Sequence, residues 1–164
     1  MTTQVAGGIA AGIVLVGGTG VGVYMLATRT SDPITLKQAL VGITDKGDYE
    51  NNAKLAGYGT NKDVLVADVP ENQSWWNARH KEKLEKIKGQ DNNRALSSHF
   101  RSVDKGYGVG ETDTTTALNK VCDTAYKLDK DGFKGTEDTD TKFQYRKDVE
   151  KFCTVKGTET LQVE

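Results

Sequence analysis

The sequence predicts a mainly α-helical protein, with a single N-terminal transmembrane helix, an irregular linker and a small soluble domain of about three helices. Three observations predict this fold class. None of the charged side chains of the 164-residue chain precedes Arg29, and the run 5–27 also lacks proline. In three later segments, apolar residues recur at intervals of three and four, which is typical of amphipathic helices. The length corresponds to about one domain.

Residues 5–27, after a tail at 1–4, are predicted to cross a membrane. A helix of this length rises about 34 Å at ~1.5 Å per residue, which spans a hydrocarbon core of roughly 30 Å. Its many glycines disfavour a helix in water, but the cost of unpaired backbone amides in lipid forces the helix to form. Tyr24 and Arg29 suit an interfacial end. A cleaved signal peptide is the alternative to this uncleaved signal-anchor, although 1–4 holds no basic residue.

The glycines of the membrane run are also spaced for close contact between two helices. Gly8 and Gly12, and again Gly18 and Gly22, stand four positions apart. This spacing predicts a homodimer through the membrane helix. In a run with seven glycines such pairs also arise by chance, so both interpretations stay open.

Two indications of membrane orientation oppose each other. Arg29, Lys37 and Lys46 follow the span, while no basic residue precedes it, and the positive-inside rule then favours a cytoplasmic domain. A bond between the two cysteines would favour an extracellular domain. The formal net charge of −1 gives no indication of nucleic acid as a partner.

Residues 28–67 are predicted to form a polar linker with short elements. Asp32 precedes Pro33, which ends any continuation of the membrane helix. The stretch 34–43 fits a short helix or strand. Glycine, asparagine, aspartate and lysine dominate 45–62, before a short apolar run at 64–66.

The first helix of the predicted domain, 68–157, covers 68–89. Its start has the form of a capping box with Pro70 in the first turn, and Gly89 supplies a stop. One face of this helix is apolar and is formed by Trp76, His80, Leu84 and Ile87. The opposite face within 79–88 is basic and is predicted to be a solvated surface or, alternatively, a docking patch for an acidic partner.

Two neighbouring tryptophans lie near the start of this helix. Trp75 and Trp76 point about 100° apart on a helix, so only one ring can be central to the core. The second ring is predicted either to pack against the linker or to bind a partner, with Arg79 beside it.

Two further helices are predicted at 113–128 and 139–154, with Gly157 as the terminator of the second and a tail at 158–164. Each helix has one apolar face. The predicted core positions are Leu118, Val121, Cys122, Ala125 and Leu128 in the first, and Tyr145, Val149, Phe152 and Cys153 in the second.

The two cysteines lie on the apolar faces of these neighbouring helices, and a Cys122–Cys153 disulfide is therefore predicted. The chain-entropy model assigns such a bond roughly 3–4 kcal/mol. In a simple antiparallel hairpin the two residues sit at different heights, so the bond requires a late start of the last helix or a steep crossing angle. The alternative is two buried free thiols in a cytosolic domain.

No motif predicts catalysis, a cofactor or a metal centre. His80 and His99 have no metal-ligand spacing with each other or with the cysteines, and His80 is predicted to be a structural imidazole. The stretch around Gly132 resembles a calcium loop but has Lys127 at the first ligand position. The glycine-rich stretch 106–110 is predicted to be a flexible turn, because it lacks the strand–helix frame of a nucleotide site.

Four pieces of the sequence together carry a family resemblance. They are the run 5–27, the segment 75–79 leading into Lys83 and Leu84, Cys122 with Tyr126, and Asp148 and Val149 before Phe152 and Cys153. In these pieces the chain resembles the short paralogous membrane-anchored proteins of the hemotropic mycoplasmas. The resemblance implies membrane association, surface display and a role as a variable antigen or host-contact protein, and it supplies no catalytic residues. The doubled tryptophan and the acidic insert 136–140 depart from the family pattern.

The expected function is therefore binding or antigenic display by a single-pass protein of the cell membrane, with its domain outside the cell and no catalytic activity. The expected partners are the lipid bilayer and a host or surface protein. The alternative is an inward-facing anchored adaptor whose cysteines are reduced and whose basic face within 79–88 docks a partner. A membrane-tethered enzyme is the third class, for which no site is found.

Overall fold

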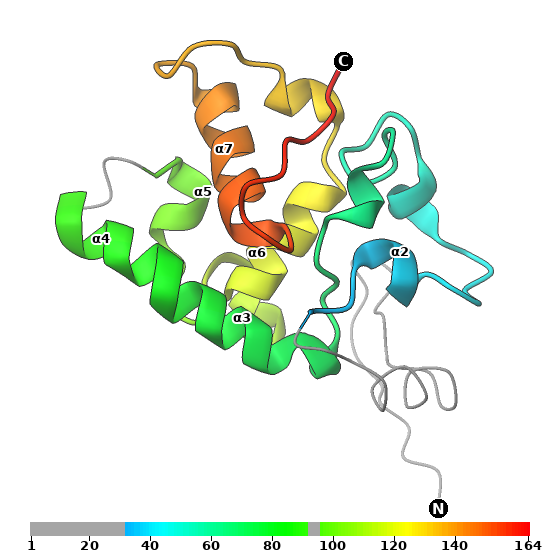
Figure 1. Cartoon of the computed structure of the whole chain (residues 1–164), viewed down its shortest axis with the longest axis horizontal. Coiled ribbons are helices and arrows are strands. Elements are labelled where there is room, and N and C mark those ends of the chain that lie inside the picture. Colours follow the sequence, from blue (N-terminus) through cyan, green and yellow to red (C-terminus); the bar gives the residue numbers. More distant parts are fainter. Residues whose placement is uncertain (1–31, 92–95) are drawn as a thin grey trace, which may run out of the picture.

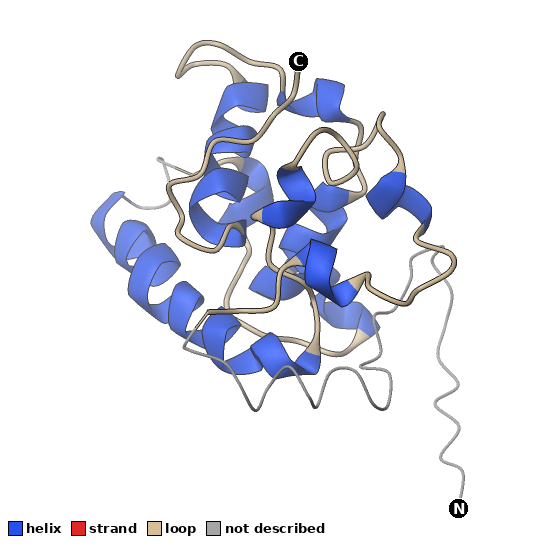
Figure 2. Ribbon diagram, turned by 45° about the vertical axis from the view of Figure 1, so that its right-hand side comes forward, coloured by secondary structure: helices blue, strands red, loops and turns tan. Residues whose placement is uncertain are grey.

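The computed structural model describes residues 32–91 and 96–164, and this part of the chain is mainly helical (Figure 1). Figure 2 shows helices joined by loops, without a strand among the described residues. The predicted tail 1–4 and membrane span 5–27 lie outside the described residues. Within 32–91 and 96–164, no helix is both long and apolar enough to cross a membrane.

The first predicted helix is present as one long rod. It comprises a 3₁₀ turn at Pro70–Asn72, α3 (Gln73–Arg79), a π-helical turn at His80–Leu84 and α4 (Glu85–Asp91). The rod continues past the predicted stop at Gly89. The predicted capping box is wrong, because Val69 is the N-cap and makes no side-chain cap bond. Asp68 instead accepts hydrogen bonds from Asn119 and Lys120 on another helix.

The other two predicted helices are α6 (Leu118–Tyr126) and α7 (Thr141–Cys153), which pack against each other. α6 is shorter than predicted, since a separate 3₁₀ turn occupies Glu111–Thr115. The predicted core position Leu128 is wrong, because α6 ends two residues earlier and Leu128 is exposed. All other core positions predicted in these two helices are buried.

Residues 32–67 belong to the domain, so the predicted linker is wrong over its described part. α2 (Leu36–Ala39) begins with a capping box at Thr35, and its Leu36 is fully buried. The apolar run 64–66 lies beside the chain that follows α7, where Val66 N donates to Cys153 O and Val155 N donates to Val64 O. The buried apolar residues of this segment are Leu36, Leu40, Tyr49, Leu55, Ala56, Leu65, Val66 and Ala67.

The predicted C-terminal tail 158–164 also packs on the core. Leu161 and Val163 are buried, and the amide of Leu161 donates to the Glu150 carboxylate. Together, the two ends of the described chain give the domain a larger core than the helices alone supply. The remaining short helices are α5 (Ser98–Arg101) and 3₁₀ turns at Gly47–Glu50, Asn61–Asp63 and Lys130–Phe133.

The domain has two opposite poles, one where the described chain begins and one at the loop 134–140. The described chain begins at the lower edge of Figure 1, beside the start of α3. The loop 134–140 and the C-terminus lie at the upper edge. The point where the chain enters the domain is therefore remote from the acidic loop.

Candidate functional site

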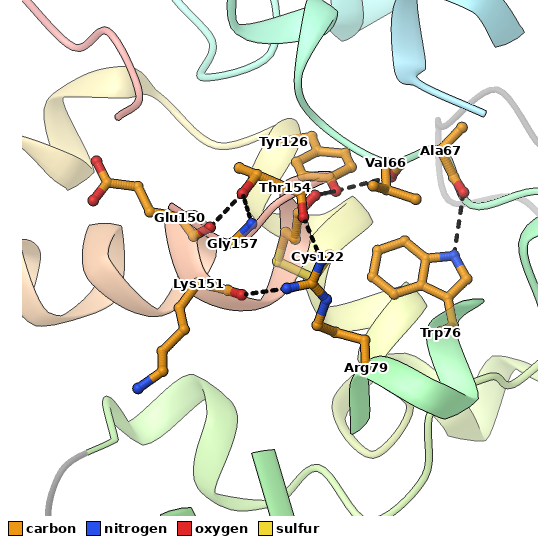
Figure 3. Close-up of a disulfide and its surroundings, with 11 residues drawn as sticks. Val66, Ala67, Trp76, Arg79, Cys122, Tyr126, Glu150, Lys151, Thr154 and Gly157 are labelled. Carbon is orange, nitrogen blue, oxygen red and sulfur yellow. Dashed lines mark hydrogen bonds between the residues drawn. A yellow bond between two sulfur atoms is a disulfide. The ribbon is translucent and has the colours of Figure 1, made fainter. Parts of the chain in front are cut away.

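Cys122 and Cys153 form a disulfide that joins the middle of α6 to the last residue of α7 (Figure 3). Their Cα atoms are 5.6 Å apart, within the usual range for such bonds, and both residues are fully buried. The predicted pairing is confirmed. α7 begins only after the 3₁₀ turn at Lys130–Phe133 and the loop 134–140, which agrees with the late start that the bond requires.

Arg79 holds the carbonyl groups at the C-terminal end of α7. Its guanidinium donates to the oxygens of Lys151 at 3.2 Å, Thr154 at 3.1 Å and Val155 at 2.6 Å. The last carbonyls of a helix have no partner within the helix and carry partial negative charge, so a cation suits this position. Only 8% of Arg79 is exposed. The predicted solvated position of Arg79 is therefore wrong.

Thr154 and Gly157 shape the turn after α7 around the guanidinium (Figure 3). The Thr154 hydroxyl donates to Glu150 O and accepts from Gly157 N. Gly157 has a φ of +75°, and a Cβ there would lie 2.4 Å from Nη1 of Arg79. Gly157 was expected to terminate the helix, but α7 ends at Cys153, and glycine at 157 instead leaves room for Arg79.

The two tryptophans have different roles. Trp76 is fully buried, and its indole Nε1 donates to Ala67 O at 3.2 Å. Trp75 is half-buried and meets Trp76 edge-on, with a centroid separation of 4.8 Å. The Arg79 guanidinium lies 4.4 Å from the centroid of the Trp75 ring, a cation–π contact. Trp75 thus covers the buried cation.

Of the three residues predicted to bind a partner, the structure turns two inward. Trp76 and Arg79 contribute to the core and to the end of α7, so neither presents its side chain to a partner. Trp75 keeps partial exposure beside them. The structure thus brings the three side chains together, but as an interior cluster next to the disulfide.

Further polar groups near the bond were not found by sequence reasoning. The Tyr126 hydroxyl is fully buried within 2.9 Å of Val66 O and 3.1 Å of Cys153 O, and burial raises its pKa well above the ordinary value. Tyr126 was recognised only through the family likeness. Its position four residues after Cys122 places it on the same helical face, a signal that points to the core.

Of the two histidines, only His80 was predicted to be structural, and it lies in the core, whereas His99 is exposed. His80 is buried, as predicted, with Nδ1 3.5 Å from a Glu85 carboxylate oxygen, and burial lowers its pKa. The His99 ring stacks on Tyr145 at 3.9 Å between centroids, and burial also lowers the pKa of His99.

Asp148 on α7 is a buried carboxylate that accepts a 2.7 Å hydrogen bond from Ser97 N, just before α5. Burial raises its pKa to about 6, against the effects of Ser97, Lys151 and Arg101. Ionised Asp148 is therefore less stable in the folded chain than in the unfolded chain. Since the folded state binds the proton more tightly, stability falls as the pH rises from about 4 to about 6.

The substitution Asp148→Asn is expected to remove this pH dependence. Asparagine can still accept the hydrogen bond from Ser97 N but carries no charge. A pKa change of about two units corresponds to about 3 kcal/mol, so we expect the variant to be more stable than the parent by ~1–3 kcal/mol at pH 7 and to gain little at pH 4. Urea unfolding at a series of pH values measures the difference, and an equal effect at both pH values would contradict it.

The exposed residues of the long rod are of mixed charge. Lys81, Lys83 and Lys86 are exposed beside Glu82 and Glu85, which is the pattern of a solvated surface. With Arg79 buried, the predicted docking patch within 79–88 loses its first basic residue.

No group of three or more His, Cys, Asp or Glu side chains in 32–91 and 96–164 is placed to hold a metal ion. The aspartates of the stretch that resembles a calcium loop form ion pairs with lysines. Asp129 pairs with Lys54 at 3.0 Å, and Asp131 pairs with Lys134 at 2.8 Å.

Apart from the cluster around the disulfide, the glycine-rich stretch 106–110 forms an ordered loop held by side-chain hydrogen bonds. Asn119, fully buried on α6, bonds both the N–H and the C=O of Gly108, each at 2.9 Å. The Asp113 carboxylate accepts from Gly110 N at 3.1 Å and from Lys105 at 2.6 Å. The loop presents Val109, which is 81% exposed. Sequence reasoning treated this stretch as a flexible turn, whereas side-chain bonds hold it on both sides.

In comparisons with known proteins, no family model, no curated protein and no solved structure matches this chain.

Proposed function

We propose that this chain is a single-pass membrane protein that displays the domain described from Asp32 onward outside the cell, as a binding or antigenic module without catalytic activity. The observation that carries the proposal is the Cys122–Cys153 disulfide. Disulfides persist in oxidising surroundings and are rare in the reducing cytosol. A structural bond in the core therefore favours an extracellular domain over a cytoplasmic one.

The position of the bond strengthens this argument. Both cysteines are fully buried between α6 and the end of α7, beside Arg79 and Tyr126. A catalytic or redox-sensing cysteine needs a partly exposed site from which its thiolate can react. A bond in this place has a structural role, which is typical of secreted and surface domains.

The shape of the domain suits display. If residues 5–27 anchor the chain, the bilayer lies near the start of the described chain, at the lower edge of the domain in Figure 1. The loop 134–140 lies with the C-terminus at the opposite pole, away from the membrane. It exposes Glu137 and Asp138, and we propose this acidic loop as the surface that meets a host or surface protein.

The likeness of the sequence motifs to the membrane-anchored proteins of hemotropic mycoplasmas is a further reason for the proposal. A homodimer through Gly8, Gly12, Gly18 and Gly22 stays a prediction, because these residues lie outside the described part of the chain. The inward-facing adaptor with reduced cysteines is the competing function, and it has less support, since Arg79 of its docking face is buried.

Protease treatment of intact cells, combined with a membrane-impermeant thiol label, tests the proposal. We expect the domain to be digested while the membrane is intact, and Cys122 and Cys153 to be labelled only after denaturation with reductant. Survival of the domain until the membrane is broken would exclude surface display. Labelling after denaturation without reductant would show that the cysteines are reduced, as the adaptor requires.

A further inference from the structure

The loop 106–110 is an ordered loop that exposes one large apolar side chain, Val109, to solvent. Asn119 pairs with both backbone groups of Gly108, and Asp113 binds the amide of Gly110. Gly106 lies so close to α3 that a Cβ there would be 2.5 Å from Trp76 O. These contacts fix the loop on three sides, so the exposure of Val109 is a property of a structured loop.

The loop lies near the point where the chain enters the domain. Ile34 O accepts from Ala67 N, and the next residue, Asp68, accepts from the side chain of Asn119 at 2.6 Å. The same Asn119 side chain holds Gly108. These hydrogen bonds, together with the peptide bond between Ala67 and Asp68, connect the entry of the chain to the residue that precedes Val109.

The length of chain before the domain limits how far this region can lie from a membrane. Four residues, 28–31, separate the predicted span 5–27 from Asp32. Fully extended, they reach at most about 14 Å. A surface next to Asp32 is consequently held at the lipid headgroups if 5–27 is the anchor.

We propose that the loop 106–110 contacts the bilayer, with Val109 inserted at the headgroup–acyl boundary, and that this contact orients the domain on the membrane. The proposal rests on the proposed function, because it takes 5–27 as the anchor. The anchor supplies the affinity by keeping the loop at a high effective concentration near the lipid. A single apolar side chain on a rigid loop then selects one orientation, in which the acidic loop 134–140 points away from the membrane.

A protein partner that covers Val109 is the competing occupant. Rigid loops with an exposed apolar tip are also used for protein recognition. The short connection to the predicted anchor favours lipid, since it leaves little space between this part of the domain and the bilayer. The test therefore has to distinguish lipid from protein.

Full-length chain reconstituted in phosphatidylcholine–phosphatidylglycerol vesicles allows this test. Two variants, Val109→Cys and Thr136→Cys, each carry one environment-sensitive fluorophore, while the native cysteines stay paired and buried. Thr136 is exposed in the loop 134–140 at the opposite pole and serves as the matched control. Nitroxide groups on the lipid acyl chains quench a probe that touches the membrane, but they do not quench one covered by protein.

We expect the probe at 109 to emit at shorter wavelength than the probe at 136 and to be quenched several-fold more strongly by the nitroxide lipids. Equal, weak quenching at both positions would overturn the membrane contact. Emission at shorter wavelength without lipid quenching would assign the loop to a protein contact instead. Flotation of the vesicles distinguishes failure of the anchor from failure of the loop contact. A chain that does not float with lipid overturns both the anchor and the contact. A floating chain with an unquenched probe at 109 overturns the contact alone.

Discussion

Replacing Arg79 by methionine is expected to lower the free energy of unfolding by about 3–5 kcal/mol, because three hydrogen bonds from a charged donor are lost and each such bond contributes about 1.5–3 kcal/mol. Methionine has a similar length and fills much of the same space, but it donates no hydrogen bond. The oxygens of Lys151, Thr154 and Val155 would lose their donor at the end of α7. Each carbonyl left buried without a partner costs about 1–3 kcal/mol.

Part of this loss is offset, since the wild-type protein already bears the cost of burying a cation. Burial lowers the pKa of Arg79, and the charges of Glu159 and Glu82 act in the opposite direction. The substitution Arg79→Lys separates charge from geometry. A lysine keeps the charge but is a point donor without the planar fork of arginine, so we expect a stability between those of the parent and Arg79→Met.

Urea unfolding followed by circular dichroism measures these effects without depending on the neighbouring tryptophans. Lys81→Met is the matched control, because Lys81 lies two positions along the same rod but is exposed. Exposed substitutions of this kind usually change stability by less than about 0.5 kcal/mol. Equal losses in Arg79→Met and Lys81→Met would contradict the role assigned to Arg79.

Local sequence patterns were sufficient to predict the three main helices and the cysteine pairing. Apolar spacing of three and four residues is a property of each segment alone, and Val149, Phe152 and Cys153 lie on the buried face that this spacing indicates. The stretches at 32–67 and 158–164 could not be placed in this way. Their backbone groups pair with partners far along the chain, as in the bond from Gln162 N to the Asn61 side chain, and such contacts leave no periodic pattern.

The error at Arg79 has a different origin. Arg79 follows Trp76 by three positions, and this spacing places a residue on the same helical face. Its charge, rather than its spacing, suggested a solvated position. The partners that make burial possible are carbonyl groups at the end of another helix, and backbone groups of this kind have no signature in the sequence.

The loop 106–110 is a surface feature whose structure local sequence patterns could not predict either. Its glycines predict a turn, but the residue that fixes the turn, Asn119, lies in the first turn of α6. An asparagine in a helix is ordinarily expected to face solvent. Here its side chain is fully buried and replaces a backbone partner for Gly108.

The double substitution Cys122→Ala and Cys153→Ala is expected to destabilise the domain by about 4 kcal/mol. The bond closes a loop between residues 31 positions apart, and its removal increases the conformational entropy of the unfolded chain by this amount in the chain-entropy model. Alanine at both positions fits the buried space without leaving a polar group unpaired. Thermal unfolding of the variant beside the parent measures the loss, and a variant as stable as the oxidised parent would contradict it.

The burial of the bond also predicts how it is reduced. Both cysteines are fully buried, so a reductant reaches the sulfurs only when the domain opens, and reduction in native buffer is expected to be slow. We then expect Arg79→Met to accelerate reduction of the disulfide by destabilising the domain, although residue 79 takes no part in the reaction of the sulfur atoms. A loss of about 3–5 kcal/mol corresponds to roughly a hundredfold to several-thousandfold increase in the open population. Reduction of Arg79→Met at the rate of the parent would show that the bond is reached by a local opening that leaves the end of α7 in place.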